Sequence, residues 1–139
     1  MNSRLRQWLN IYQFIAGLCD TSTGVLLVGF PDYTLSTLIG LTIVPPRPFI
    51  RFIGVFVLAV GLTYFWSLVR YPLNDDGSIV WMTQWKITAL IRALVALFVL
   101  WQVTAHTIDF RWIAVALTDG FFAAMQMIGL EQGWIERAS

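Results

Sequence analysis

The chain has 139 residues, of which 58% are hydrophobic and 12% are charged, and its nine Lys and Arg residues nearly balance its eight Asp and Glu residues. Because soluble domains contain roughly 45–50% apolar and 25% charged residues, this composition excludes an ordinary soluble domain. The near-neutral balance provides no basic surface for nucleic acid, and no nucleic-acid partner is expected. A single cysteine, Cys19, excludes an internal disulfide.

Long apolar stretches follow one another along the chain, at about residues 8–30, 48–69, 81–105 and 110–130. Each has about 20 residues or more, which at ~1.5 Å rise per residue is enough to cross a hydrocarbon core of about 30 Å. The stretches lack the alternating pattern of membrane β-barrel strands. The sequence therefore predicts an all-α fold, in which one domain forms an integral membrane bundle of four transmembrane helices.

The connections between these stretches are short, so consecutive helices should be antiparallel neighbours. The longest connection, residues 31–48, reads PDYTLSTLIGLTIVPPRP. In it Asp32 can cap a short helix, and Pro45 and Pro46 prevent the helix from continuing. We expect a short interfacial helix between the first two spans. All seven tryptophans lie at or near the ends of the spans, where indole rings anchor helices at the membrane interface.

Three ionisable residues, Asp20, Arg92 and Asp119, lie inside the first, third and fourth spans. Each comes about ten or eleven residues from the span end on the side of the N-terminus, at a depth of roughly 15–17 Å. At the bilayer midplane a charge costs from about 2.5 to more than about 10 kcal/mol, so such residues face the bundle interior and pair. The sequence predicts a buried Asp20/Arg92/Asp119 cluster, for which a purely structural role and a functional role are both open.

Both aspartates belong to stripes of small and polar residues spaced three and four apart. The stripes are Gln13, Gly17, Asp20 and Gly24 in the first span and Ala116, Asp119, Ala123 and Gln126 in the fourth. Small residues allow membrane helices to approach closely, so these faces should form helix contacts. Because the two spans run in opposite directions, Gln13 and Gln126 should fall on the same side of the aspartates, about 10 Å away. They extend the predicted cluster into a second polar layer.

His106 and Gln102 lie within one turn at the far end of the third span, on roughly the same face as Arg92. They are candidates for a proton relay to the cluster, and the alternative is that His106 is an ordinary surface group. A lone histidine offers no bis-imidazole haem site, and no metal is expected. GxSxG, Walker and HExxH patterns do not occur, so we assign no catalytic residue and favour a protein that is not an enzyme.

Several segments resemble the DoxX-like class of small four-helix bacterial membrane proteins. They are AGLCDTSTGVLL in the first span, PDYTLSTLIGL after it and FIRFIGVFVLAVGLTYFW in the second span. The resemblance implies a bacterial inner-membrane location. Some members of that class are described as subunits linked to quinone and sulfur-compound oxidation, which implies quinone as a candidate cofactor. Tyr64 and Trp66 would then be the candidate quinone contacts, against the alternative that they anchor the helix at the interface.

The distribution of Lys and Arg near the span ends predicts the orientation. The side that carries the N-terminus has more of them: Arg4, Arg6, Arg70, Lys86 and Arg137, against Arg47, Arg51 and Arg111. Both termini are therefore expected in the cytoplasm.

Three functions are compatible with these observations. The favoured one is a non-catalytic accessory or assembly subunit, in contact with the lipid bilayer and with partner membrane subunits or a second copy of the chain. The second is a small proton-coupled transporter or channel-like oligomer, with Asp20 and Asp119 as titrating groups. The third, implied by the DoxX-like resemblance, is a quinone- or redox-associated membrane subunit.

Overall fold

The computed structural model describes residues 3–42, 45–73 and 75–139, apart from the side chains of residues 75 and 76. These residues form helices and connections, with no strand among them. The elements are α1 (Ser3–Gly29), η1 (Tyr33–Leu38), α2 (Arg47–Arg70), α3 (Asp75–Thr104), η2 (Phe110–Trp112), α4 (Ile113–Glu131) and α5 (Trp134–Ala138). Four helices are long and apolar enough to cross a membrane, which confirms the predicted all-helical fold with four candidate spans.

The helix boundaries differ from the sequence-based ones at several places. α1 begins at Ser3 rather than near Trp8, and the short helix α5 was not predicted. The connection after α1 contains the predicted short helix, but η1 is a π-helix. The Asp32 side chain does not cap it and instead pairs with Arg47 at 2.7 Å, which links the connection to the start of α2.

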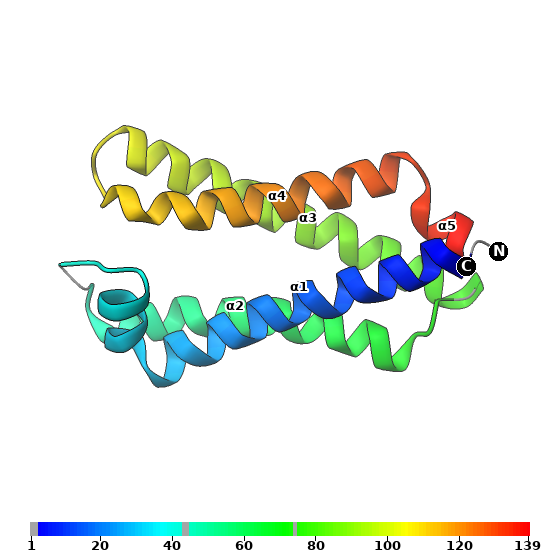
Figure 1. Cartoon of the computed structure of the whole chain (residues 1–139), viewed down its shortest axis with the longest axis horizontal. Helices are drawn as coiled ribbons and strands as arrows, with labels where there is room; N and C mark the ends of the chain where they lie inside the picture. The colour runs from blue at the N-terminus through cyan, green and yellow to red at the C-terminus, as the bar shows by residue number, and fades with distance from the viewer. Residues whose placement is uncertain (1–2, 43–44, 74) are drawn as a thin grey trace.

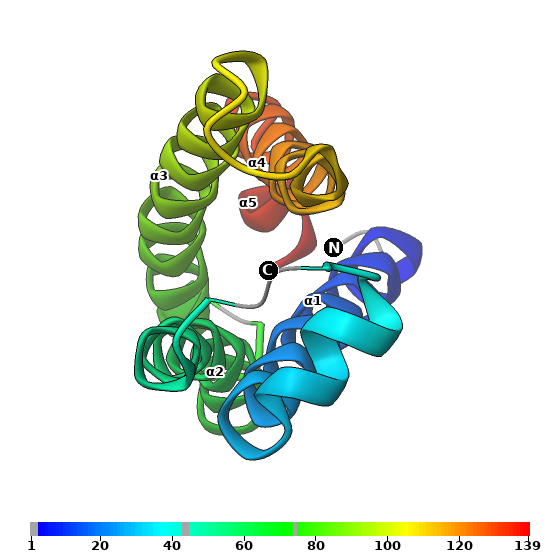
Figure 2. The same cartoon turned by 90° about the vertical axis from the view of Figure 1, so that its left-hand side faces the viewer.

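The four long helices form two antiparallel hairpins, α1 with α2 and α3 with α4 (Figure 1). The end of the bundle that carries α5 and both chain termini is called here the terminal end, and the end with η1 and η2 the distal end. Figure 1 shows the hairpins close together at the terminal end and farther apart at the distal end. Viewed from the distal end, α1 lies beside α2 and α3 beside α4 (Figure 2).

Glycines bring the backbones of α1 and α2 into direct contact. A Cβ atom at Gly24 would lie 2.5 Å from the backbone nitrogen of Leu58, and one at Gly61 would lie 2.5 Å from that of Thr21. Neither distance is possible for a real side chain, so only glycine permits this approach. Small residues are the usual means of close packing between membrane helices, where burial from water does not drive association. The first hairpin is therefore joined along much of its length.

The buried core is divided unevenly between the two ends of the bundle. In the terminal half one cluster unites all the long helices with α5: Leu9, Tyr12, Ala16, Tyr64, Leu73, Trp81, Trp85, Phe122, Ile135 and Ala138. In the distal half each hairpin has a cluster of its own: Leu27, Leu35, Leu41 and Ile50 in the first, and Val99, Val103 and Ala116 in the second. The half-buried Trp112 packs against both distal clusters.

Two tryptophans expected at the membrane interface are core residues instead. Trp81 and Trp85 are 0% and 1% exposed. Their indole nitrogens donate to internal acceptors, Trp81 to the Tyr71 carbonyl at 2.9 Å and Trp85 to the Gln13 side chain at 3.0 Å. α3 begins before Trp81, at Asp75, so both rings lie inside the bundle rather than at its rim.

Candidate functional site

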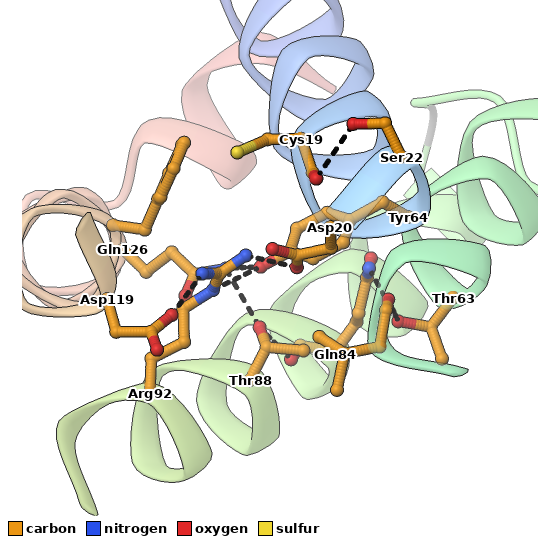
Figure 3. Close-up of polar contacts among 12 residues, drawn as sticks. Cys19, Asp20, Ser22, Thr63, Tyr64, Gln84, Thr88, Arg92, Asp119 and Gln126 are labelled. Carbon is orange, nitrogen blue, oxygen red and sulfur yellow. Dashed lines mark hydrogen bonds and ion pairs between the residues drawn. The ribbon is translucent and has the colours of Figure 1, made fainter. Parts of the chain in front are cut away.

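Arg92 of α3 is bonded to side chains from each of the other three long helices (Figure 3). Its Nη1 donates to Asp119 Oδ1 of α4 at 2.7 Å, and its Nη2 forms a short ion pair with Asp20 Oδ2 of α1. Its Nε donates to the Tyr64 hydroxyl of α2 at 3.3 Å. Each guanidinium nitrogen thus has one partner, and each partner comes from a different helix. We call Asp20, Tyr64, Arg92 and Asp119 the arginine layer.

Aromatic rings enclose the guanidinium. Its central carbon lies 4.7 Å from the Phe122 ring centroid and 5.7 Å from the Tyr64 centroid, within the range of cation–π attraction. The Arg92 side chain is 3% exposed, whereas those of Asp20 and Asp119 are 10% and 20% exposed. The arginine is therefore sealed, and Asp119 is the more accessible of its two carboxylates.

Gln126 extends the arginine layer. It is fully buried, and its Nε2 donates to the Tyr64 hydroxyl and to Thr88 Oγ1, both at 2.8 Å. Its Oε1 is buried and has no hydrogen-bond partner among the described residues. Through Tyr64, Gln126 shares a hydroxyl oxygen with Arg92, so it stabilises the position of that hydroxyl.

Gln13 belongs to a separate network. Its Nε2 donates to Ser67 Oγ at 2.7 Å and to Gln84 Oε1 at 2.5 Å, and its Oε1 accepts from the Trp85 indole. Ser67 also donates to Gln84 Oε1, at 2.7 Å. We call Gln13, Ser67, Gln84 and Trp85 the glutamine layer. The two glutamines predicted to form one layer thus take different partners, although both are fully buried.

Of the remaining candidate residues, Tyr64 belongs to the arginine layer, whereas His106, Gln102 and Trp66 form no hydrogen bond with it in the described part of the chain. His106 is exposed and has a left-handed backbone conformation, with φ of 55°, in the turn after α3. Gln102 accepts hydrogen bonds from the Thr107 hydroxyl and not from the arginine layer. Tyr64 is 0% exposed and its hydroxyl is bonded to Arg92 and Gln126, whereas Trp66 is 65% exposed. Within the described part of the chain, no group of three or more His, Cys, Asp and Glu residues could hold a metal ion.

Several members of the two layers, and the Phe122 ring beside Arg92, were not singled out from the sequence. Tyr64 was assigned to a quinone cleft or an interface, and Ser67, Gln84 and Phe122 were not considered. A partial signal existed in α3, where Gln84, Thr88 and Arg92 follow one another at intervals of four and so share one face. No comparable signal marks Phe122, because a phenylalanine in an apolar span is the ordinary case.

Chemically, the two layers supply side-chain hydrogen bonds and ion pairs between helices. The positive charge of Arg92 meets two carboxylates, so with both ionised the arginine layer carries one net negative charge. The sequence was compared with models of protein families, with curated proteins and with solved structures, and none of them matched.

Proposed function

We propose that this chain is a non-catalytic accessory or assembly subunit of the bacterial inner membrane, with both termini in the cytoplasm. In this proposal the arginine layer joins two helical hairpins and sets the shape of the surface that partner subunits or a second copy of the chain recognise. The observation that carries the proposal is that Arg92 is bonded to side chains of α1, α2 and α4. The DoxX-like resemblance supports the membrane assigned here.

The energetics of buried charge favour a structural role for this layer. When one partner of a buried ion pair is removed, the other is left uncompensated, at a cost of about 3–5 kcal/mol. Separating the hairpins at this level would leave Asp20 in the first hairpin without its cation, whereas Arg92 would keep Asp119 of its own hairpin. The arginine layer therefore resists separation of the hairpins, to which the distal half adds the packing of Trp112 against both distal clusters.

The outer faces of the helices provide surface for lipid and for partners. Large apolar side chains that are more than half exposed line α2, as at Phe52 and Phe56, and α3, as at Leu97 and Phe98. The glycines that allow the closest helix approach are already used inside the first hairpin. Contacts with another subunit would then use these larger side chains. The shape of the surface that they form depends on the angle between the hairpins.

The test compares Arg92→Met with Arg51→Gln, which removes an exposed arginine at the distal end. For Arg92→Met we expect reduced accumulation in the membrane and loss of any complex larger than one chain on a native gel. Arg51→Gln should leave both unchanged. If Arg92→Met accumulates and assembles normally, the proposed role of the arginine layer is wrong.

One observation favours a second candidate, a proton-coupled carrier. Asp119 is the more exposed carboxylate in a layer with an excess negative charge, and Gln126 Oε1 on the same helix has no hydrogen-bond partner among the described residues. Protein reconstituted in liposomes with an internal pH-sensitive dye distinguishes the two candidates. A proton flux that Asp119→Asn abolishes while the protein stays assembled would favour the carrier. The absence of any proton flux would favour the assembly subunit.

A further inference from the structure

A partly open apolar pocket of about 250 Å³ lies at the terminal end, away from the arginine layer. Its walls come from α1, α3, α4 and α5, and four of its lining residues are aromatic: Trp8, Tyr12, Trp85 and Trp134. The volume is several times the roughly 30 Å³ that a water molecule takes in the liquid. A pocket lined by apolar side chains offers water few hydrogen bonds and favours apolar molecules.

The polar atoms of the aromatic walls are bonded elsewhere. The Tyr12 hydroxyl donates to the Phe122 carbonyl at 3.3 Å, and the Trp134 indole nitrogen donates to Gln132 Oε1 at 2.8 Å. The Trp85 indole is bonded to Gln13 in the glutamine layer. These three rings therefore present carbon surface to the pocket, and the part of a ligand that it holds must be apolar.

Glycine at position 129 allows two of the rings to form this wall. A Cβ atom at Gly129 would lie 2.6 Å from the Trp85 ring and 2.8 Å from the Trp134 ring. With any larger residue, one of these rings would have to move.

The length of α1 sets the depth of the pocket in a membrane. With 27 residues α1 is about 40 Å long, whereas the hydrocarbon core is about 30 Å thick. Its first turn therefore reaches the headgroup layer, and Leu9 and Tyr12, two turns further on, lie at the level of the acyl chains. A ligand in the pocket can extend from the hydrocarbon to the headgroups.

Arginines lie on the helix faces that line the pocket. Arg4 is one turn before Trp8 on α1, and Arg137 is three residues after Trp134 on α5, so each shares a face with a lining tryptophan. Both are exposed, and the Arg137 guanidinium is fixed by hydrogen bonds to the Gln132 and Gly133 carbonyls.

Two acidic side chains lie near the same corner. The Glu136 carboxylate lies against Gly133, and Glu131 is exposed at the end of α4. With Arg6 also at the start of α1, the described side chains of the first turn of α1, the last turn of α4 and α5 carry three positive charges against two negative ones. Two of the three positive charges, Arg4 and Arg137, lie on the tryptophan faces.

We propose that this pocket binds one acyl chain of an anionic phospholipid, with the lipid phosphate bound by Arg4 and Arg137. Tryptophan and tyrosine gather at the headgroup level of a membrane, and basic side chains at that level attract anionic lipid. This site is independent of the arginine layer, and its presence does not depend on the function proposed above.

The test uses the full-length protein in a neutral detergent, with phosphatidylglycerol that carries a photoreactive diazirine in its acyl chain. After illumination, mass spectrometry of peptides locates the labelled residues. We expect saturable labelling concentrated in residues 5–12 and 125–134, displaced by unlabelled phosphatidylglycerol and not by phosphatidylcholine with the same chains. Labelling spread evenly over exposed residues such as Phe52 and Leu97, or equal displacement by both lipids, overturns the proposal.

Variants separate the charge from the pocket. Arg4→Gln should lower the apparent affinity for phosphatidylglycerol about five-fold, and Arg51→Gln at the distal end should not change it. Met125→Trp fills the pocket and should reduce labelling of residues 5–12, with a thermal unfolding midpoint close to that of the unaltered protein as the check on folding. A folded Met125→Trp protein that is labelled as strongly as the unaltered one contradicts the assignment of the chain to this pocket.

Discussion

The terminal and distal halves of the bundle are held together differently. In the terminal half a single aromatic core joins both hairpins and α5, whereas in the distal half each hairpin has its own buried cluster and the half-buried Trp112 packs against both. The arginine layer lies between these two regions and bonds one hairpin to the other. The comparison teaches that the two kinds of helix contact have separate physical origins. Within the first hairpin the backbones pack closely, whereas between the hairpins aromatic rings pack and buried polar groups bond.

The residues of each half explain the difference. The terminal half of α3 contributes Trp81 and Trp85, which are large enough to reach across the bundle to α1 and α2. Further along α3, Leu94 and Leu97 are 59% and 64% exposed and contact no shared core. Without a driving force from water, aliphatic side chains gain little by facing another helix instead of lipid tails.

The largest expected effect comes from breaking the bond between the hairpins. Arg92→Met leaves Asp20 and Asp119 without their cation and should lower the free energy of unfolding by about 3–5 kcal/mol. Thermal unfolding in detergent measures the loss. Asp119→Asn is the matched variant, because it retains the pair between Arg92 and Asp20, and its loss should be clearly smaller. Equal losses for the two variants would contradict the central position given to Arg92.

The next largest effect is expected from disturbing the close packing of α1 and α2 at Gly24. Gly24→Ala forces α1 away from Leu58, and overpacking of this kind should cost about 1–3 kcal/mol. Gly29→Ala is the control, because a Cβ atom there would have no atom within 4 Å. The midpoint of thermal unfolding should fall for the first variant and stay or rise slightly for the second. An unchanged unfolding midpoint for Gly24→Ala would show that the backbones of α1 and α2 are not in direct contact at Gly24.

A similar or somewhat smaller effect tests the packing of the terminal half. Trp85→Phe keeps an aromatic ring in the core but leaves Gln13 Oε1 without its donor, a loss of about 1–3 kcal/mol for a buried acceptor. Trp101→Phe changes a tryptophan that is 64% exposed, in the distal half, and should change stability little. Urea or thermal unfolding of both variants measures the difference, and similar values for the two would contradict a core role for Trp85.

The smallest effect concerns the surface of the distal end. Asp32 and Arg47 are paired at 2.7 Å, but their side chains are 48% and 67% exposed. Asp32→Asn should therefore lower stability by less than about 1 kcal/mol, and the difference should shrink as salt is added. A larger loss that salt does not reduce would show that this pair contributes more than an exposed ion pair does.

The sequence predicted the parts of the structure that follow from the free-energy cost of placing charged groups in hydrocarbon. Asp20, Arg92 and Asp119 are expensive in hydrocarbon, so their common depth was sufficient to place them together. Ser67 and Gln84 carry no charge, and whether they face each other depends on how α2 and α3 are rotated about their axes. The separate distal clusters depend on the angle between the hairpins, which no local pattern encodes. Trp81 and Trp85 were misplaced because a tryptophan near a helix end has the same sequence signature whether it faces lipid or the core.

The position of Arg92 makes it a pivot. Its two carboxylate partners come from α1 on one side and α4 on the other, and toward the distal end the hairpins that carry them have separate buried clusters with Trp112 packed against both. A rotation of one hairpin relative to the other would therefore centre on Arg92. A small rotation about the guanidinium would displace η1 and η2 relative to each other at the distal end. The aromatic core at the terminal end would oppose that displacement.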